Sequence, residues 1–300
     1  WLVKRHNLWF YRKDYLKKKI EINEQELRAI QYDFSDFDSG NEYIDPAHLY
    51  TYDLDVFGDY SLFQYINRTS TPVGKQHLAD WFNAHLELKE SIEQRQEAIR
   101  ELSTDLEYRQ QIRLFGLLYK GKPADTNEIR EWAGSPSYYR KHTLLRIIPT
   151  VVSIINLICI GSAIVGILPA TVPGGVFFCF VIFSSIFSKG ITKLQATYGK
   201  KLQILSTYAD QILLTEKKEM NSPVLQQLKT ELTSQNQTAS QAVRQLSKLM
   251  NALDQRSNLL MSTILNGLIF WELRQVMRIE KWKETHASDL PRWIETIGEI

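Results

Sequence analysis

The stretch IIPTVVSIINLICIGSAIVGILPATVPGGVFFCFVIFSSIFS, residues 147–188, contains no charged side chain. Its first part, Ile147–Leu168, makes a helix about 33 Å long, since each residue adds about 1.5 Å. That length crosses the roughly 30 Å hydrocarbon core of a bilayer. Two prolines and two glycines between residues 169 and 175 then indicate a turn. The second part, Val172–Ser188, is equally apolar but shorter, so the stretch predicts a helical hairpin.

Basic residues flank the hairpin on both sides. Arg140, Lys141 and Arg146 precede it, and Lys189 and Lys193 follow it. Because Lys and Arg concentrate on the cytoplasmic side of membrane helices, both ends are expected in the cytoplasm. The hairpin would then enter the inner membrane and return, with membrane lipid as its partner. The alternative is a hairpin buried in the core of a soluble domain.

Small polar residues and two cysteines lie inside the apolar run. Under either interpretation, Asn156, Ser153 and Ser162 are suited to contacts between helices. Cys159 and Cys179 are the only cysteines, which excludes a disulfide framework and a cysteine-based metal site. Both are therefore interpreted as small apolar side chains.

The N-terminal segment is basic and aromatic. Residues 1–19, WLVKRHNLWFYRKDYLKKK, interleave Lys and Arg with Trp, Phe and Tyr, a mixture suited to a helix beside anionic lipid headgroups. A solvated amphipathic helix is the equal alternative. Because the chain begins at Trp1 and stops at Ile300 without a terminal signal, we expect both ends to be cuts in a longer protein.

The remaining chain predicts helices joined by short breaks. A helix is expected to end near Lys19 and another to begin after Asn23 as its N-cap, followed by an acidic, aromatic loop over residues 33–59. Helical patterns recur over 60–68, 89–103, 191–219, 239–253 and 289–300, and Pro72 is placed to open a further helix. The apolar stretch 258–277 predicts one buried helix. No strand pattern is present, so the fold class is all-α.

Catalytic and cofactor-binding signatures are absent from the sequence. The net charge of +2 gives no bulk attraction to nucleic acid, and the six histidines lack the i, i+4 spacing of a helical zinc site. Residues 116–123 match the Gly-x4-Gly-Lys part of a phosphate-binding loop, but Pro123 stands where a Ser or Thr hydroxyl should bind Mg²⁺. The acidic loop does not have EF-hand spacing. We expect no enzyme activity and no cofactor within these residues.

One ordered series of motifs over residues 53–102 resembles the start of the core domain of MutS mismatch-repair ATPases. The family's segments are Gly-x-x-Ser-Leu, then Asn-Arg-Thr-x-Thr-x-x-Gly, then Leu-x-x-Trp, then a helix with Ile-x-x-Arg-Gln. The matching positions are Gly58, Ser61, Leu62, Ile66, Asn67, Arg68, Thr69, Thr71, Gly74, Leu78, Trp81, Phe82, Ile92, Arg95, Gln96, Glu97, Ala98 and Ile99. The final WIETIGEI, residues 293–300, is similar to the last core helix.

The resemblance implies a helical core with long lever helices and an inserted transmembrane-like hairpin. Its parts would be a basic segment and acidic loop (1–50), the first part of the core (51–140), the hairpin (141–190) and the lever-type helices (191–300). It implies a C-terminal ATPase domain outside this chain, which would bind ATP and Mg²⁺ and form a homodimer. The hairpin stands where mismatch-repair members carry a DNA-gripping clamp, so membrane-spanning MutS-related proteins are the more similar set.

The function implied is that of a non-catalytic lever and membrane anchor that couples the ATPase to DNA or to a partner. In that role the basic residues Arg68 and Lys75, beside the break at residues 69–72, are candidates for a phosphate contact. Mismatch-repair members also read mismatches with a Phe-x-Glu motif, and we expect no counterpart here. The alternative function is a membrane-bound helical interaction module without a role on DNA.

Overall fold

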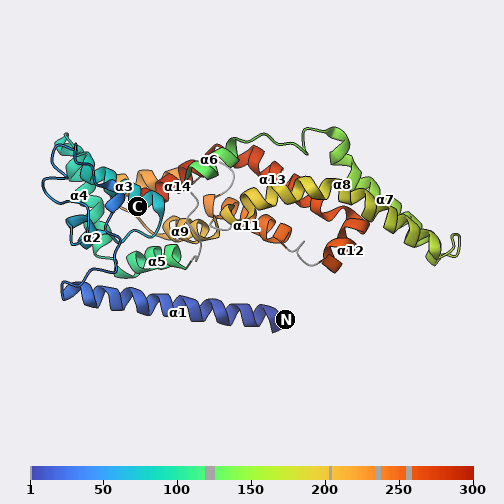
Figure 1. The fold of residues 1–300 in the computed structure, drawn as a ribbon, viewed down its shortest axis with the longest axis horizontal. Coiled ribbons are helices and arrows are strands. Elements are labelled where there is room, and N and C mark those ends of the chain that lie inside the picture. Colours follow the sequence, from blue (N-terminus) through green and yellow to red (C-terminus); the bar gives the residue numbers. More distant parts are fainter. Residues whose placement is uncertain (1, 119–125, 203–204, 234–237, 255–258) are drawn as a thin grey trace. The chain divides into compact units, whose positions relative to one another are not determined.

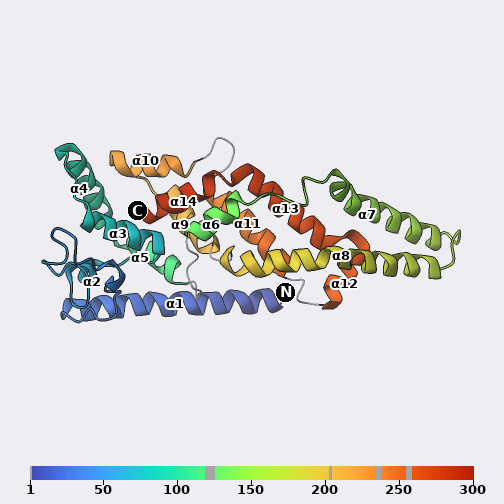
Figure 2. The same ribbon diagram turned by 45° about the horizontal axis from the view of Figure 1, so that its top comes forward.

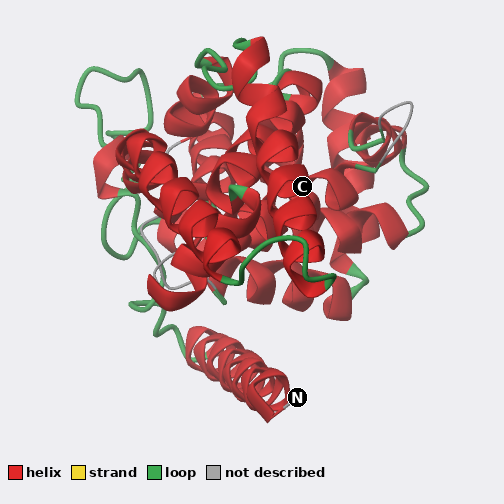
Figure 3. Ribbon diagram, turned by 90° about the vertical axis from the view of Figure 1, so that its right-hand side faces the viewer, coloured by secondary structure: helices red, strands yellow, loops and turns green. Residues whose placement is uncertain are grey.

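The computed structural model describes residues 2–118, 126–202, 205–233, 238–254 and 259–300. Over these ranges the regular elements are helices, as Figure 3 shows, with one isolated bridge between Thr233 and Thr238. The expected all-α class is confirmed. The helices are α1 (Leu2–Ile30), η1 (Asn41–Tyr43), α2 (Leu62–Ile66), α3 (Pro72–Asn83), α4 (Lys89–Ser103), α5 (Leu106–Leu117), α6 (Thr126–Gly134), α7 (Thr143–Ile164), α8 (Thr171–Leu202), α9 (Leu205–Lys217), α10 (Pro223–Glu231), α11 (Ala239–Asp254), α12 (Leu259–Ile269), α13 (Trp271–His286) and α14 (Asp289–Glu299). Residues 119–125 lie outside the described residues. They include the end of the segment that partly matches a phosphate-binding loop.

The chain forms two compact units. Unit 1 consists of residues 1–125, 207–241 and 292–300, and unit 2 of residues 126–206 and 242–291. The segment boundaries expected after residues 50, 140 and 190 stay predictions.

Helix α1 lies along α5 in unit 1, as Figure 2 shows. It is one continuous helix, so the expected break between Lys19 and Asn23 is wrong. Asn23 does not cap a new helix, because its Nδ2 donates to the Lys19 carbonyl one turn earlier, at 2.7 Å. A side chain that satisfies its own helix in this way does not interrupt it.

The acidic, aromatic segment between α1 and α2 is held by apolar contacts. Val56 and Phe57 pack with Phe63 of α2 and Ala79 of α3, and a second small cluster joins Ala29, Phe34 and Phe37. A third cluster links α4 and α5 to α10 through Ala98, Tyr108, Met220, Leu225 and Leu228. Unit 1 therefore has several small cores, and the first two hold the acidic, aromatic segment against α1, α2 and α3.

Helices α7 and α8 pack side by side as the hairpin of unit 2, coloured green to yellow in Figure 1. The predicted hairpin is present, but its turn lies at residues 165–170, earlier than expected, with Gly166 at φ +83°. Pro173 lies in the first turn of α8, where its missing N–H has no helical partner to lose. Helix α8 continues to Leu202, so the second apolar helix is longer than predicted.

The apolar stretch 258–277 forms two helices rather than one. They separate at Phe270, whose φ of +50° lies in the left-handed region. Helix α13 is largely buried as expected, but the interpretation of a buried helix is wrong for α12, because Leu260 is 78 % exposed. Helix α11 coincides with the helical pattern predicted over residues 239–253, and Ala242, Val243, Leu246 and Met250 form its buried face.

Candidate functional site

Gly58, Ser61 and Leu62 shape the entry to α2. Gly58 has φ +116°, a conformation that side chains other than glycine rarely adopt, and its N–H donates to the Ser39 carbonyl at 2.9 Å. Ser61 is the N-cap of α2, and its Oγ accepts the Gln64 N–H at 3.2 Å. Leu62 is half-exposed. This first motif segment therefore has a local structural explanation, which is a tight turn followed by a helix cap.

Asn67 holds the turn between α2 and α3. Its side chain is buried, and Nδ2 donates to the Asp38 carbonyl at 3.0 Å. Its Oδ1 accepts both the N–H and the hydroxyl of Thr69, at 3.0 and 2.6 Å. The side-chain amide thus holds the turn itself with two hydrogen bonds and ties it to the acidic loop with a third.

Thr71 and Gly74 begin α3 and place it against α14. The Oγ1 of Thr71 accepts the Gly74 N–H at 3.1 Å, which caps the helix. A Cβ on Gly74 would lie 3.2 Å from the Gly298 carbonyl oxygen, so the two backbones nearly touch. Gly74 belongs to the motif, and Gly298 lies in the C-terminal WIETIGEI segment. Unit 1 therefore brings these two family-like segments together.

Arg68 lies in an ion-pair cluster. Its Nε donates to Glu26 of α1 at 2.7 Å, and the guanidinium carbon lies 3.5 Å from the centroid of the Phe37 ring. Arg113 of α5 donates to the same Glu26 oxygen at 2.6 Å. Partial burial and the nearby Arg68 lower the pKa of Arg113, although Glu26 opposes the shift. Arg68 thus joins α1 to the acidic loop, and Glu26 connects it to Arg113 of α5.

Lys75 is engaged by the acidic loop. Its Nζ donates to Asp38 at 2.6 Å and also to Glu42, and it lies over the ring of Tyr43. Partial burial works against ionisation of Asp38, but hydrogen bonds from Lys75 and from the Gly40 N–H hold its pKa below the ordinary value. Carboxylates thus neutralise both Arg68 and Lys75, and the phosphate contact stays a prediction.

The last motif positions lie on α3 and α4. The Arg95 guanidinium carbon is 4.2 Å from the centroid of the Trp81 ring, a cation–π contact that pairs the two motif helices. Gln96 is exposed on α4. The described residues hold no cluster of three metal-ligating side chains.

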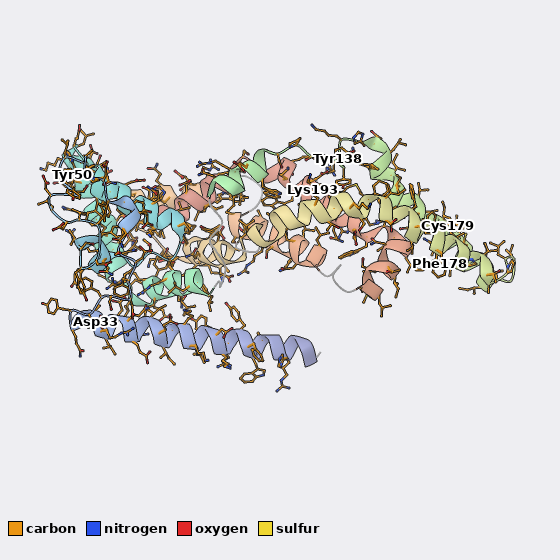
Figure 4. The ribbon with its side chains drawn as sticks, in the orientation of Figure 1. Asp33, Tyr50, Tyr138, Phe178, Cys179 and Lys193 are labelled. Carbon is orange, nitrogen blue, oxygen red and sulfur yellow. The ribbon has the colours of Figure 1, made fainter. Side chains whose placement is uncertain are left out.

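The hairpin of unit 2 is exposed and apolar. Thr143–Ile164 and Thr171–Lys193 are long and apolar enough to cross a membrane, by length and composition. Their outer surfaces carry large apolar side chains, and Phe178 and Cys179 project from α8 in Figure 4. Leu157 is 73 % exposed and Ile164 81 % exposed. A hairpin buried in a soluble core would cover these side chains.

Asn156 connects the hairpin to α12. Its Nδ2 donates to the carbonyls of Gly267 and Leu268, both at 3.0 Å, so the predicted interhelical contact is confirmed. Ser153 also makes such a contact, because its Oγ accepts from Arg274 at 2.8 Å. The Ser162 carbonyl instead accepts the Ile167 N–H in the hairpin turn.

Arg274 and Glu280 were not predicted as contact residues, because a single polar residue on a helix gives no distinctive pattern. Arg274 donates to the Pro149 carbonyl at 2.6 Å. The carboxylate of Glu280 accepts the N–H groups of Tyr138, Tyr139 and Arg140 at 2.8, 3.1 and 2.7 Å. Both residues lie on α13, which is therefore hydrogen-bonded to α7 and to the segment that precedes it.

The expectation that Phe-x-Glu has no counterpart is wrong in spelling, because the triplet occurs at Phe270, Trp271 and Glu272. Phe270 is 1 % exposed and packs against the rings of Phe180, Phe183 and Phe187, with centroids 5.7 to 6.3 Å away. The Glu272 carboxylate accepts the Ser262 hydroxyl at 2.8 Å. The triplet thus belongs to the connection between α12 and α13, where its ring is not available to stack on a base.

Among the comparisons with known proteins, one match is found, to a protein-family model. No curated protein and no solved structure matches the chain. The model of MutS domain III matches residues 49–265, which include the motif positions between Gly58 and Ile99, the hairpin, α9 to α11 and part of α12. Because that match covers more than half of the sequence, the chain belongs to the MutS family.

Proposed function

We propose that the chain is the lever and membrane anchor of a MutS-related ATPase. The observation that carries this proposal is that an uncharged, exposed hairpin lies within residues matched by MutS domain III. The ATPase domain, with its ATP and Mg²⁺, would lie elsewhere in the full-length protein, and this chain would catalyse nothing. The family relationship supports a role related to DNA mismatch repair and the capacity to dimerise through that domain.

The exposed apolar surface of the hairpin supports its role as a membrane anchor. Soluble monomers rarely expose contiguous apolar patches larger than a few hundred Å². Side chains such as Ile154, Leu157 and Ile158 of α7, and Phe178 and Ile182 of α8, are all more than half exposed. Lipid acyl chains would cover them, while Arg146 and Lys189 would lie near the headgroups of the cytoplasmic leaflet.

Transmission through the lever requires firm connections between the hairpin and the helices behind it. Asn156 binds the end of α12, Arg274 of α13 binds the Pro149 carbonyl, and Glu280 binds the segment that leads into α7. A displacement of α13 would therefore also move the base of the hairpin, because helices that are packed together shift as rigid bodies.

A fractionation experiment tests the anchor. The chain should remain in the membrane pellet after alkaline carbonate extraction. A double variant, Leu157→Lys with Phe178→Lys, should move to the supernatant, because each charge costs about 2.5–3.5 kcal/mol at the bilayer centre. The matched control is Leu49→Lys, at a 91 % exposed leucine of unit 1, which should stay in the pellet. Release of the unmodified chain would support the soluble-core alternative.

A second experiment separates the lever from a plain interaction module. The intact protein should hydrolyse ATP and this chain alone should not. DNA binding by the intact protein should weaken steeply as salt is raised, because phosphate contacts release counterions. ATP hydrolysis by this chain would contradict the proposal, and an intact protein that ignores DNA would favour the membrane-bound module.

A further inference from the structure

The outer edge of α12 is apolar and exposed. We define it by Leu260, Met261 and Ile264, which are 78 %, 50 % and 48 % exposed. They share one side of the helix, since residues three and four apart are neighbours on its surface. The sequence from Ser257 to Trp271 contains no charged residue, so no charge in this segment opposes transfer into an apolar environment.

Helix α12 packs on the hairpin itself. It contacts both α7 and α8, and in Figures 1 and 2 it runs across their direction rather than alongside them. A Cβ on Gly267 would lie 2.3 Å from the Phe177 ring and 2.8 Å from Val181. Only glycine allows this approach, and small residues serve the same purpose where helices meet in membranes.

The C-terminal end of α12 has its carbonyls satisfied without water. The Asn266 carbonyl accepts the Phe270 N–H at 3.1 Å, and the Gly267 and Leu268 carbonyls accept Asn156. The Ile269 carbonyl accepts Arg274 Nε at 2.7 Å. A helix end in water leaves these groups to solvent, whereas a helix end inside a bilayer requires protein donors for all of them.

The contact with Asn156 places this helix end deep along the hairpin. Asn156 lies eight residues before Ile164, about 12 Å from the end of α7 at a rise of 1.5 Å per residue. It lies about 20 Å from Thr143, at the other end of the same helix. If α7 crosses the bilayer, the C-terminal end of α12 lies near mid-depth.

We infer that α12 is a third membrane element, which enters one leaflet beside the hairpin and presents Leu260, Met261 and Ile264 to lipid acyl chains. The inference rests on the proposed membrane anchor. Helix α12 has 11 residues, about 16 Å, which is too short to cross a bilayer. Through Phe270, α12 leads directly into α13, which also binds the hairpin through Arg274. The bilayer would therefore be connected to α13 in two ways, through the hairpin and through α12.

Lipid-dependent fluorescence quenching tests this inference. Cys159 and Cys179 are replaced by alanine, and one cysteine carrying the fluorophore NBD is introduced as Met261→Cys, Leu157→Cys or Lys281→Cys. Leu157 is the hairpin control, and Lys281, exposed on α13, is the aqueous control. Each chain is reconstituted in phosphatidylcholine–phosphatidylglycerol vesicles with or without doxyl-labelled phosphatidylcholine. Circular dichroism verifies that each variant is folded.

The inference predicts a blue-shifted emission at residue 261 and quenching by doxyl lipid comparable to that at residue 157, with none at residue 281. Quenching at 157 but not at 261 would overturn the inference and leave the anchor intact. Absence of quenching at both would overturn the anchor as well. A label at 261 that neither doxyl lipid nor aqueous iodide quenches would mean that protein, such as a second copy, covers this edge, and would also overturn it.

Discussion

At Gly74 and Gly298 the backbones of α3 and α14 approach so closely that a side chain at either position would meet the other helix. A Cβ on Gly298 would lie 2.4 Å from Val73 Cγ1 and 3.1 Å from the Gly74 nitrogen. Neither glycine has a positive φ, so the constraint is the space between α3 and α14 rather than backbone conformation. The motif glycine therefore matters because a helix far along the sequence passes it closely.

Gly298→Ala should destabilise the protein by about 1–3 kcal/mol, the usual cost of inserting a methyl group into a packed contact. The measurement is urea unfolding in detergent, followed by far-ultraviolet circular dichroism. Gly134→Ala is the matched control, since a Cβ there meets nothing within 4 Å. It should be neutral or slightly stabilising. Unchanged stability in Gly298→Ala would show that α3 and α14 are free to separate.

Asp105 gives unit 1 a pH-dependent contact. The carboxylate accepts from Lys218 Nζ at 2.6 Å and from the Tyr108 N–H at 2.9 Å, and these hydrogen bonds hold its pKa below 3.8. Since folding lowers this pKa, the ionised form favours the folded state. The contribution to stability is complete above the unfolded pKa of about 3.9 and is lost as pH falls through the folded pKa.

Asp105→Asn should therefore be less stable than the unmodified chain at neutral pH, and the difference should shrink as pH falls from about 5 to about 3. Asn retains the cap of α5 while losing the charge, so the pH-dependent part reports the contribution of the ionised carboxylate. The measurement is the free energy of unfolding across that range. Lys218→Met should weaken the same dependence, because the Tyr108 N–H still favours the ionised form. A difference independent of pH would assign the loss to the cap alone.

At the scale of elements, the hydrogen-bonded connection between α7 and α12 depends on the side-chain amide of Asn156. Asn156→Leu keeps the volume but leaves the carbonyls of Gly267 and Leu268 without a donor. We expect a loss of about 1–2 kcal/mol, at the upper end for hydrogen bonds between membrane helices. Thermal unfolding in detergent measures it.

Ser185→Ala is the control for that variant, because the Ser185 hydroxyl only returns to the Ile182 carbonyl of its own helix. It should change stability by less than about 0.5 kcal/mol. Equal effects of the two substitutions would mean that Asn156 contributes no more than a local helical bond.

The sequence predicted elements wherever apolar spacing and a breaking residue coincide. Pro72 opens α3 and the buried face of α11 lies where the spacing placed it, because these signals are local. The prediction that α12 is buried was wrong. An uncharged apolar sequence has the same composition whether protein or lipid covers the helix, so the sequence does not distinguish the two. The break at Phe270 was missed because a bulky aromatic residue rarely adopts positive φ.

The candidate site was less predictable than the fold. The motif residues were recognised from their order, but their roles depend on partners distant in sequence. Arg68 meets Glu26 of α1, and Gly74 meets Gly298. A single sequence does not reveal such pairs, whereas the Thr71 cap, which is local, could have been inferred from the Pro72 that follows it.

At the scale of the whole molecule, the two compact units each contain their own packed helices. The hairpin and α12, through which lipid would bind, both lie in unit 2, and a ligand that binds the folded state stabilises what it contacts. We therefore expect hydrogen exchange to respond separately in the two units. Gly298→Ala should increase exchange in peptides from residues 1–118 and 207–233 and leave the peptides of α13 unchanged.

Asn156→Leu should do the reverse, with faster exchange in peptides covering α12 and α13 and little change in α3 to α5. Moving from detergent to vesicles should slow exchange in unit 2 only. Each result follows because contacts that lie within one unit contribute to the local unfolding free energy of that unit. Parallel changes in both units for either variant would instead mean that the chain unfolds as one cooperative body. A lever that carries motion from a motor to a membrane would then depend on the stability of every helix at once.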